Sequence, residues 1–181
     1  MKERTLIVIK PDGMQHEKKI LPYYEKAGLR IAEKKTLKIE RKFAEKHYSA
    51  NDEQVIGMGN KSIVASKEMG IYDKMISLFG TEDPRMIGMK LREWLIKFIT
   101  SAPVTAIILE GEDAIKLTRK ITGFTDPSSA DKETVRGSLG TDSIAKANSE
   151  GRPVMNLVHA SGSKKEAESE IELWVPELSK S

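Results

Sequence analysis

Short apolar runs alternate with segments of helical periodicity along most of the 181-residue chain. Residues 6–9 form a β-branched run followed by Pro-Asp-Gly, and residues 20–27 carry apolar side chains at helical spacing before Gly28. These patterns predict a buried strand that ends in a turn, and then a helix terminated by glycine. Weak alternation over 29–39 predicts a strand with one solvated face, and we expect a short helix at 41–48.

The segment 49–85 has poor periodicity, although residues 71–79 are too apolar for a disordered stretch. We therefore expect helical pieces that pack against the next helix. Asp83 and Pro84 combine an N-cap residue with a proline at the first helical position, which predicts where that helix begins. Its apolar side chains share one stripe and are Ile87, Leu91, Trp94, Leu95 and Phe98.

The C-terminal half opens with a strongly apolar run at 104–109, which predicts a strand closed by Glu110-Gly111. Asp113 is expected to cap the helix that follows. Residues 122–152 are rich in Gly, Ser, Thr, Asp and Pro, and we expect a long functional loop there. A short strand is predicted at 154–159.

Ser163-Lys-Lys-Glu166 has the spacing of a capping box, so a final helix is expected there with Ala167, Ile171 and Trp174 facing inward. The order of elements predicts an α+β fold, a ferredoxin-like βαββαβ sandwich with an antiparallel sheet, extra helices and a mid-chain insertion. A doubly wound parallel sheet remains the alternative, because pattern alone does not set strand direction. We expect one domain over 1–181, with the insertion at about 49–90.

Composition narrows the class of protein only a little. Hydrophobic residues make up 39% and charged residues 31% of the chain, and the net charge of +3 is too balanced to argue for nucleic acid. No apolar run approaches the roughly 20 residues of a membrane span, and the first residues lack a secretory apolar region. There is no cysteine, so we expect a cytoplasmic protein without disulfides or a thiolate metal site.

The residues that could carry chemistry are cations, hydroxyls and one histidine at the ends of predicted elements. Groups of this kind suit phosphate binding, and the nucleophilic imidazole ring suits group transfer. Each also has a structural interpretation, as a solvated Lys or Arg or as a hydrogen-bonded histidine at a strand exit. From the residues alone the chain is an anion-binding domain with a possible histidine nucleophile. The candidates are Lys10, Arg119, Thr125, Arg136, Asn156, His159 and Ser161.

Five motifs in this order resemble the signature of the nucleoside diphosphate kinase family. They are Lys10-Pro-Asp-Gly13, Thr125-x-Pro127, Thr134-Val-Arg-Gly137, Asn156-Leu-Val-His-Ala-Ser161 and Ala167-Glu-x-Glu-Ile171. The set is specific as an ordered whole, and the resemblance covers about residues 3–48 and 101–176. The His-Ala-Ser form is most similar to archaeal members.

The resemblance implies a ferredoxin-like enzyme that moves the γ-phosphate of a nucleoside triphosphate to a nucleoside diphosphate through a phosphohistidine. His159 matches the phosphate acceptor, Glu170 the carboxylate that orients its ring, and Ser161 the serine that links the two. Mg²⁺ would bridge phosphate oxygens, so no metal ligand is expected from the protein.

The remaining site residues also follow from the resemblance. Lys10, Arg119, Thr125, Arg136 and Asn156 match phosphate and ribose contacts, Tyr48 lies next to the phosphates, and the base is expected between Leu91 or Leu95 and Pro153. The chain departs from the common pattern at His16, Ser138-Leu139, Met155 and Gly162.

The expected partners are ATP and other nucleoside di- and triphosphates, with no membrane and no required nucleic acid. The family's assemblies favour a homo-hexamer over a tetramer, with the loop at 122–136 at the trimer contact. Two alternatives stay open. One is a non-enzymatic nucleotide- or RNA-binding ferredoxin-like module, although the predicted strands lack the aromatic residues with which such RNA-binding modules contact bases. The other is a relative that binds nucleotides without turnover.

Overall fold

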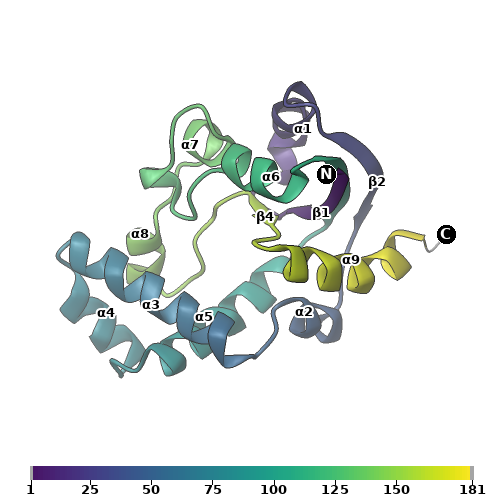
Figure 1. The fold of residues 1–181 in the computed structure, drawn as a ribbon. Helices are drawn as coiled ribbons and strands as arrows, with labels where there is room; N and C mark the ends of the chain where they lie inside the picture. Colours follow the sequence, from purple (N-terminus) through teal and green to yellow (C-terminus); the bar gives the residue numbers. More distant parts are fainter. Residues whose placement is uncertain (1, 180–181) are drawn as a thin grey trace.

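A four-stranded antiparallel sheet forms the centre of the protein, whose computed structural model describes residues 2–179. The strand order is β2-β3-β1-β4, which is the ferredoxin-like arrangement and excludes the parallel alternative (Figure 1). The strands are β1 (Lys2–Ile9), β2 (Arg30–Leu37), β3 (Val104–Glu112) and β4 (Val158–Ala160).

Both faces of the sheet are covered, which is why Leu6–Ile9 at the end of β1 is fully buried. Ile7 and Ile9 pack in one core cluster with residues of α1 (Glu17–Lys26) and α6 (Ala114–Thr122). Leu6 and Val8 belong to a second cluster on the opposite face. That cluster includes residues of α2 (Arg41–His47), α5 (Pro84–Ile99) and α9 (Lys164–Ser179).

The expected helical pieces of the insertion are present and pack on α5. They are α3 (Asp52–Glu68) and α4 (Tyr72–Phe79). Helices α3 and α5 approach closely at two glycines: a Cβ at Gly59 would lie 1.9 Å from the Pro84 carbonyl oxygen, and one at Gly88 would lie 1.9 Å from that of Val55. Met75, Phe79, Ile87 and Leu91 form the small core of this part.

The segment predicted as a long loop contains two short helices and a helical turn. They are η2 (Pro127–Ser129), α7 (Val135–Leu139) and α8 (Ile144–Ser149), and a further turn, η1 (Met14–His16), precedes α1. Side chains within the segment cap both helices, since Thr134 accepts from Gly137 N and Ser143 accepts from Lys146 N. The Ser and Thr residues that contributed to the loop prediction thus serve as helix caps.

Two predicted boundaries and one predicted capping hydrogen bond are wrong. Strand β3 continues through Glu110-Gly111 to Glu112, because Lys2 to Arg4 of β1 pair with it there. Asp113 precedes α6 in a left-handed conformation and makes no capping hydrogen bond, whereas Glu3 accepts from Ile115 N. The last strand covers only Val158–Ala160 rather than 154–159.

Candidate active site

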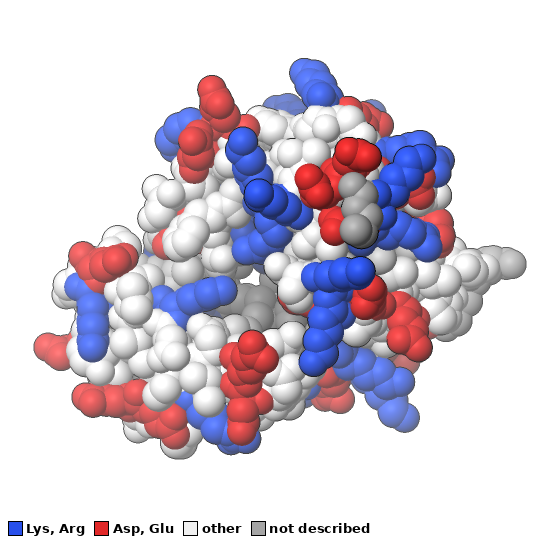
Figure 2. Space-filling view, viewed as in Figure 1, with Lys and Arg blue, Asp and Glu red and all other residues white. Residues whose placement is uncertain are grey.

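A cleft of about 880 Å³ opens between the sheet with α9 and the insertion with α5. It is lined by every site residue inferred from the sequence except Ser161, which is buried behind the wall. Lys and Arg side chains border the hollow in the space-filling view (Figure 2). The cations that line the cleft are Lys10, Lys46, Lys61, Arg119, Arg136 and Lys165.

His159 projects into this cleft from the middle of β4, between the buried Val158 and Ala160. The alternation of a strand places it on the opposite side from these two neighbours, and its side chain is 20% exposed. The pairing of β4 with β1, in which His159 is opposite Val8, fixes the backbone at this point.

Glu170 reaches His159 from α9, where it is buried on the same stripe as Ala167 and Trp174. One carboxylate oxygen lies 2.7 Å from His159 Nε2, and the other accepts a 2.6 Å hydrogen bond from Ser161 Oγ. Burial by itself would raise the pKa of Glu170, but the neighbouring His159, His47 and Ser161 outweigh it and lower the pKa to about 2. Glu170 is therefore a carboxylate at physiological pH, and His159 Nδ1 is the ring nitrogen not engaged by it.

The backbone before His159 makes a tight turn that other parts of the chain hold in place. Leu157 has a φ of +68°, and Val158 N donates to Asn156 O at 2.7 Å. A leucine in this conformation is strained, which requires support from its surroundings. Asp12 accepts from Leu157 N at 2.9 Å, and a Cβ at Gly13 would lie 2.5 Å from Leu157 O.

Lys10 leaves the end of β1 and is buried at the base of the cleft. Its Nζ donates to Asn156 Oδ1 at 2.5 Å, and the amide of Asn156 donates in turn to Thr125 O at 2.8 Å. Burial lowers the pKa of Lys10 to about 8; Asp12 opposes that shift and Arg136 adds to it. Three predicted phosphate-site residues are thus joined by direct contacts.

Arg136 places a buried guanidinium beside the tight turn. It donates to the carbonyl oxygens of Asn156, Gly123 and Val158 at 3.1, 3.1 and 2.6 Å. Burial lowers its pKa to about 10, and the nearby Arg119 adds to the lowering. Arg119 itself donates to Ala160 O at 3.4 Å. Neither of these arginines has an ion pair among the described side chains, so their positive charges are available to an anion in the cleft.

The predicted base site is made of aliphatic side chains. Leu91 and Leu95 of α5 line the cleft, and so does Pro153. Met58 of the inserted α3 lines the same cleft. The insertion therefore contributes to the cavity wall.

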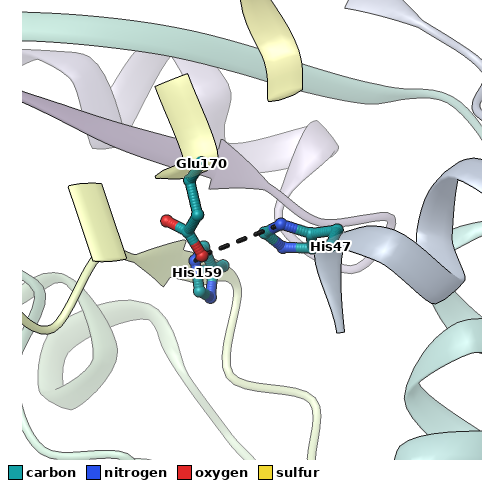
Figure 3. Close-up of side chains that lie close together, drawn as sticks. All are labelled: His47, His159 and Glu170. Carbon is teal, nitrogen blue, oxygen red and sulfur yellow. Dashed lines mark hydrogen bonds and ion pairs between the residues drawn. The ribbon is translucent and has the colours of Figure 1, made fainter. Parts of the chain in front are cut away.

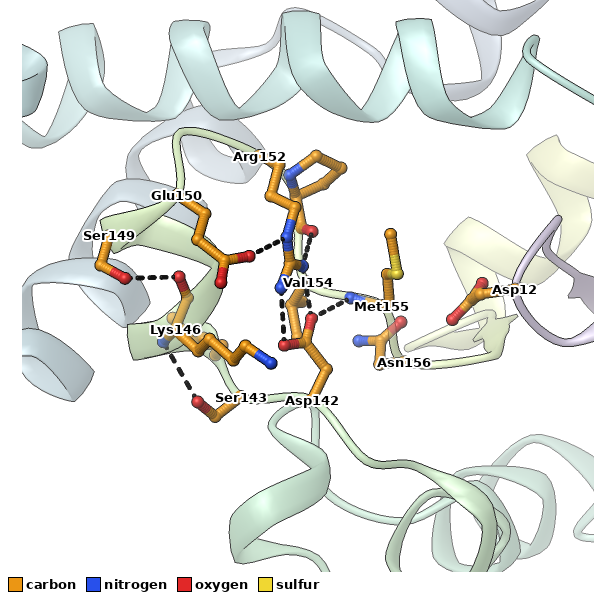
Figure 4. A network of polar contacts seen from close by, with 12 residues as sticks. Asp12, Asp142, Ser143, Lys146, Ser149, Glu150, Arg152, Val154, Met155 and Asn156 are labelled. Carbon is orange, nitrogen blue, oxygen red and sulfur yellow. Dashed lines mark hydrogen bonds and ion pairs between the residues drawn. The ribbon is translucent and has the colours of Figure 1, made fainter.

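Sequence reasoning missed two features of the site. Asp142 accepts from Arg152 at 2.6 and 3.0 Å and from Met155 N at 2.8 Å, which anchors the segment leading to Asn156 (Figure 4). His47 lies against His159, with ring centroids 4.6 Å apart. The His47-Tyr48 pair was visible in the sequence, but nothing in the local pattern indicated that α2 packs beside β4.

This fold and this site define an α+β domain whose cleft joins a carboxylate-held histidine to buried cations. A family model described as "Nucleoside diphosphate kinase" matches residues 3–66 and 62–179 of this chain. A nucleoside diphosphate kinase of Pyrobaculum aerophilum is 38% identical over 177 residues, which cover 97% of this chain and 96% of the relative. One of Pyrococcus furiosus is 33% identical and covers 95% of this chain and 82% of the relative.

Solved structures agree with the sequence relatives. The crystal structure of an NDP kinase from Pyrobaculum aerophilum matches with a TM-score of 0.89 and 38% identity, covering 96% of both chains. A transition state mimic of the Borrelia burgdorferi enzyme with bound vanadate and ADP matches with a TM-score of 0.71 and 27% identity, covering 96% of this chain and 86% of that one. The chain belongs to the nucleoside diphosphate kinase family. It is a phosphotransferase that passes the γ-phosphate of a nucleoside triphosphate to a nucleoside diphosphate.

Proposed function

We propose that His159 carries the phosphoryl group between the two nucleotides. The lone pair on Nδ1 attacks the γ-phosphorus, the bond to the β-phosphate oxygen breaks, and the nucleoside diphosphate leaves. In the second half the oxygen of another diphosphate attacks the phosphohistidine, and Nδ1 is the leaving group. The observation that carries this proposal is the 2.7 Å contact of Glu170 with Nε2, which leaves Nδ1 for the reaction.

Glu170 and Ser161 are proposed to orient the ring. A carboxylate at Nε2 favours the tautomer with its proton on that nitrogen, so the lone pair is on Nδ1. As the ring becomes positively charged during attack, the carboxylate also stabilises that charge. Ser161 Oγ donates to the second oxygen and accepts from Leu6 N at 3.4 Å, which fixes the carboxylate to the sheet.

The cations of the cleft are proposed to bind the phosphates. In phosphoryl transfer the protein acts mainly by positioning and by electrostatic stabilisation, which suits buried groups held by Asn156 and by backbone carbonyls. The base would lie between Leu91 or Leu95 and Pro153, and Tyr48 would lie next to the phosphates. Apolar contacts of this kind do not read the hydrogen-bonding edge of a base, so several nucleobases should be accepted. The phosphate and ribose contacts proposed are Lys10, Arg119, Thr125, Arg136 and Asn156.

The nucleotide is proposed to bind as its Mg²⁺ complex. The carboxylates that line the cleft are Glu53, Glu166 and Glu170, and Glu170 is already engaged by His159 and Ser161. Mg²⁺ commonly keeps several waters and binds through substrate phosphates. Phosphate oxygens would therefore supply most of its ligands, and the ion would balance the charge between the β- and γ-phosphates.

The test is to incubate the protein with radiolabelled ATP and Mg²⁺ and to map the label. We expect an acid-labile, alkali-stable phosphate on His159. His159→Ala should abolish labelling and transfer while nucleotide binding is retained, because the phosphate contacts come from other residues. His16→Ala, which changes a histidine outside the cleft, is the matched control and should label normally. Label on Ser161, or rapid transfer without a labelled His159, would contradict the assignment.

We also propose a single domain over 1–181 with the insertion at about 49–90, a cytoplasmic location, and a homo-hexamer. A chain without cysteine needs no oxidising compartment to form disulfides, which agrees with this location. None of the helices in the described part of the chain has the length and apolarity of a membrane span. Phe124, 63% exposed within the segment 122–136, supports a contact between copies there.

A further inference from the structure

His47 is a buried histidine that the proposed reaction leaves without a role. It is the last residue of α2, its side chain is fully buried, and it lies between His159 and Trp174. Both of these rings meet it edge-on, with centroids 4.6 and 5.5 Å away. Glu170 Oε1 lies 3.7 Å from His47 Nδ1 (Figure 3). Two imidazole rings therefore flank one carboxylate oxygen.

The contact with Trp174 determines where His47 carries its proton. The indole N–H can only donate, and it lies 3.2 Å from His47 Nδ1. Nδ1 must therefore accept, which places the single proton of the neutral ring on Nε2. Burial lowers the pKa of His47 to about 3; the charge of His159 adds to the lowering, and that of Glu170 opposes it. The ring is accordingly neutral at physiological pH.

The Trp174 indole is the contact that selects this tautomer. His47 Nε2 is buried and has no hydrogen-bond partner among the described residues, so its proton is left without an acceptor and nothing on that side of the ring favours the Nε2–H form. The assignment therefore depends on the indole donor. The titratable groups that face the ring are Glu170 from α9, His159 from β4 and the adjacent Tyr48, whose ring centroid lies 4.8 Å away.

The alternative tautomer would compete for Glu170. A proton on Nδ1 of His47 would face Glu170 Oε1, and a small movement would close the 3.7 Å gap to a hydrogen bond. The same oxygen is the partner of His159 Nε2. A second imidazole donor would draw the carboxylate away from the ring that it orients.

We propose that Trp174 and His47 form a positioning pair: Trp174 keeps the His47 proton away from Glu170, so that the carboxylate serves His159 alone. The pair rests on the proposed function of His159 and acts through Glu170 without touching the substrate. In this arrangement the Trp174 indole orients the His47 imidazole, so that the Glu170 carboxylate can orient the imidazole of His159.

The direct test is the tautomer of His47. The chain has three histidines, so their ¹⁵N resonances can be assigned by substitution. We expect His47 in the parent protein to carry its proton on Nε2 at neutral pH, and to shift toward Nδ1–H in Trp174→Phe. A parent protein with the proton on Nδ1 would overturn the proposal, even if no variant folds. This measurement needs no turnover, so it stands apart from the labelling of His159, whose failure would remove the proposed function.

The functional test compares the turnover numbers of a single and a double variant. Trp174→Phe keeps an aromatic ring against Phe43 but removes the N–H, and we expect the turnover number to fall about 10-fold with little change in KM. Adding His47→Phe removes the competing donor, so the double variant should be faster than Trp174→Phe. A double variant that is slower still would show a merely structural role and refute the pair. Trp94→Phe, the other tryptophan of the chain, is the matched control, because Trp94 packs on Phe79 away from the cleft.

Discussion

The sequence places Glu170 on a helix but does not determine which group its carboxylate contacts. The carboxylate could have paired with a surface lysine on its own helix, a contact that contributes at most about 1 kcal/mol. That reading is wrong, because Glu170 is 6% exposed and its oxygens contact His159 and Ser161. Helical spacing from Ala167 and Trp174 explains the burial, and the length of the turn before α9 brings the side chain to β4.

Removing the negative charge of Glu170 should slow turnover without weakening binding. Glu170→Gln keeps the size of the side chain but loses the charge that stabilises the developing imidazolium. We expect turnover to fall by about 10- to 100-fold, the usual loss for a group that supports a reactive one. Steady-state kinetics with ATP and a diphosphate would show it, with KM nearly constant. Unchanged turnover would exclude the orienting role, and a change confined to KM would place Glu170 at the nucleotide.

Lys10 should make nucleotide binding depend on pH in the alkaline range. Its pKa is lowered to about 8, so the free protein loses this positive charge as pH rises through that value. A bound phosphate favours the charged form, so binding near pH 8 should take up about half a proton, and affinity should fall above it. Calorimetry in two buffers of different ionisation enthalpy measures the uptake. Lys10→Met should show none of it; equal uptake by both proteins would disprove the assignment.

At the scale of elements, the inserted helices show where local pattern succeeds. The apolar residues at 71–79 and the caps Asn51 and Asp83 are local signals, and α3, α4 and α5 form around them. The close contact of α3 with α5 is different in kind. It depends on Gly59 and Gly88, whose missing side chains let the two backbones approach. A glycine within a helix does not indicate such a close contact until the partner helix is known.

The two glycines of α3 should respond in opposite ways to alanine. At Gly59 the new methyl group would meet the Pro84 carbonyl, so we expect Gly59→Ala to lower the free energy of unfolding by about 1–3 kcal/mol. At Gly57, where nothing lies within 4 Å, alanine should raise it by up to about 1 kcal/mol, because it favours the helix. Urea unfolding of both variants makes the comparison, and equal effects would contradict the packing described.

At the scale of the whole molecule, the assembly should depend on the exposed aromatic side chain of the segment 122–136. Light scattering should give the mass of six chains of 20.2 kDa for the parent protein. Phe124→Ser should dissociate it toward smaller species, because the proposed contact between copies would bury this side chain, which is 63% exposed in the single chain. Leu78→Ser on α4, a site outside that segment, is the control and should leave the mass unchanged. A parent that is monomeric, or a Phe124→Ser variant that stays a hexamer, would refute the proposed contact.

The active site depends both on local sequence motifs and on contacts between distant segments. The ordered motifs pointed to Lys10, Asn156 and His159, because cations and a histidine at element ends are local features of the chain. They did not indicate that the last strand would shorten to Val158–Ala160. The strand begins late because Asn156 turns its side chain to Lys10 and Thr125, and Leu157 takes a left-handed conformation that cannot continue a ladder.

What the sequence by itself determined is local: the strands and most of the helices, the caps at Asp83 and Ser163, the glycine after α1, and the motifs that mark the family. These follow from interactions between residues a few positions apart. The tertiary structure decided the rest: the antiparallel direction of the strands, the Asp12 contact that holds Leu157, and the meeting of His47 with Glu170 and Trp174. Those contacts join segments far apart in the sequence, and hydrogen bonding and packing between distant segments select them only once the chain has folded.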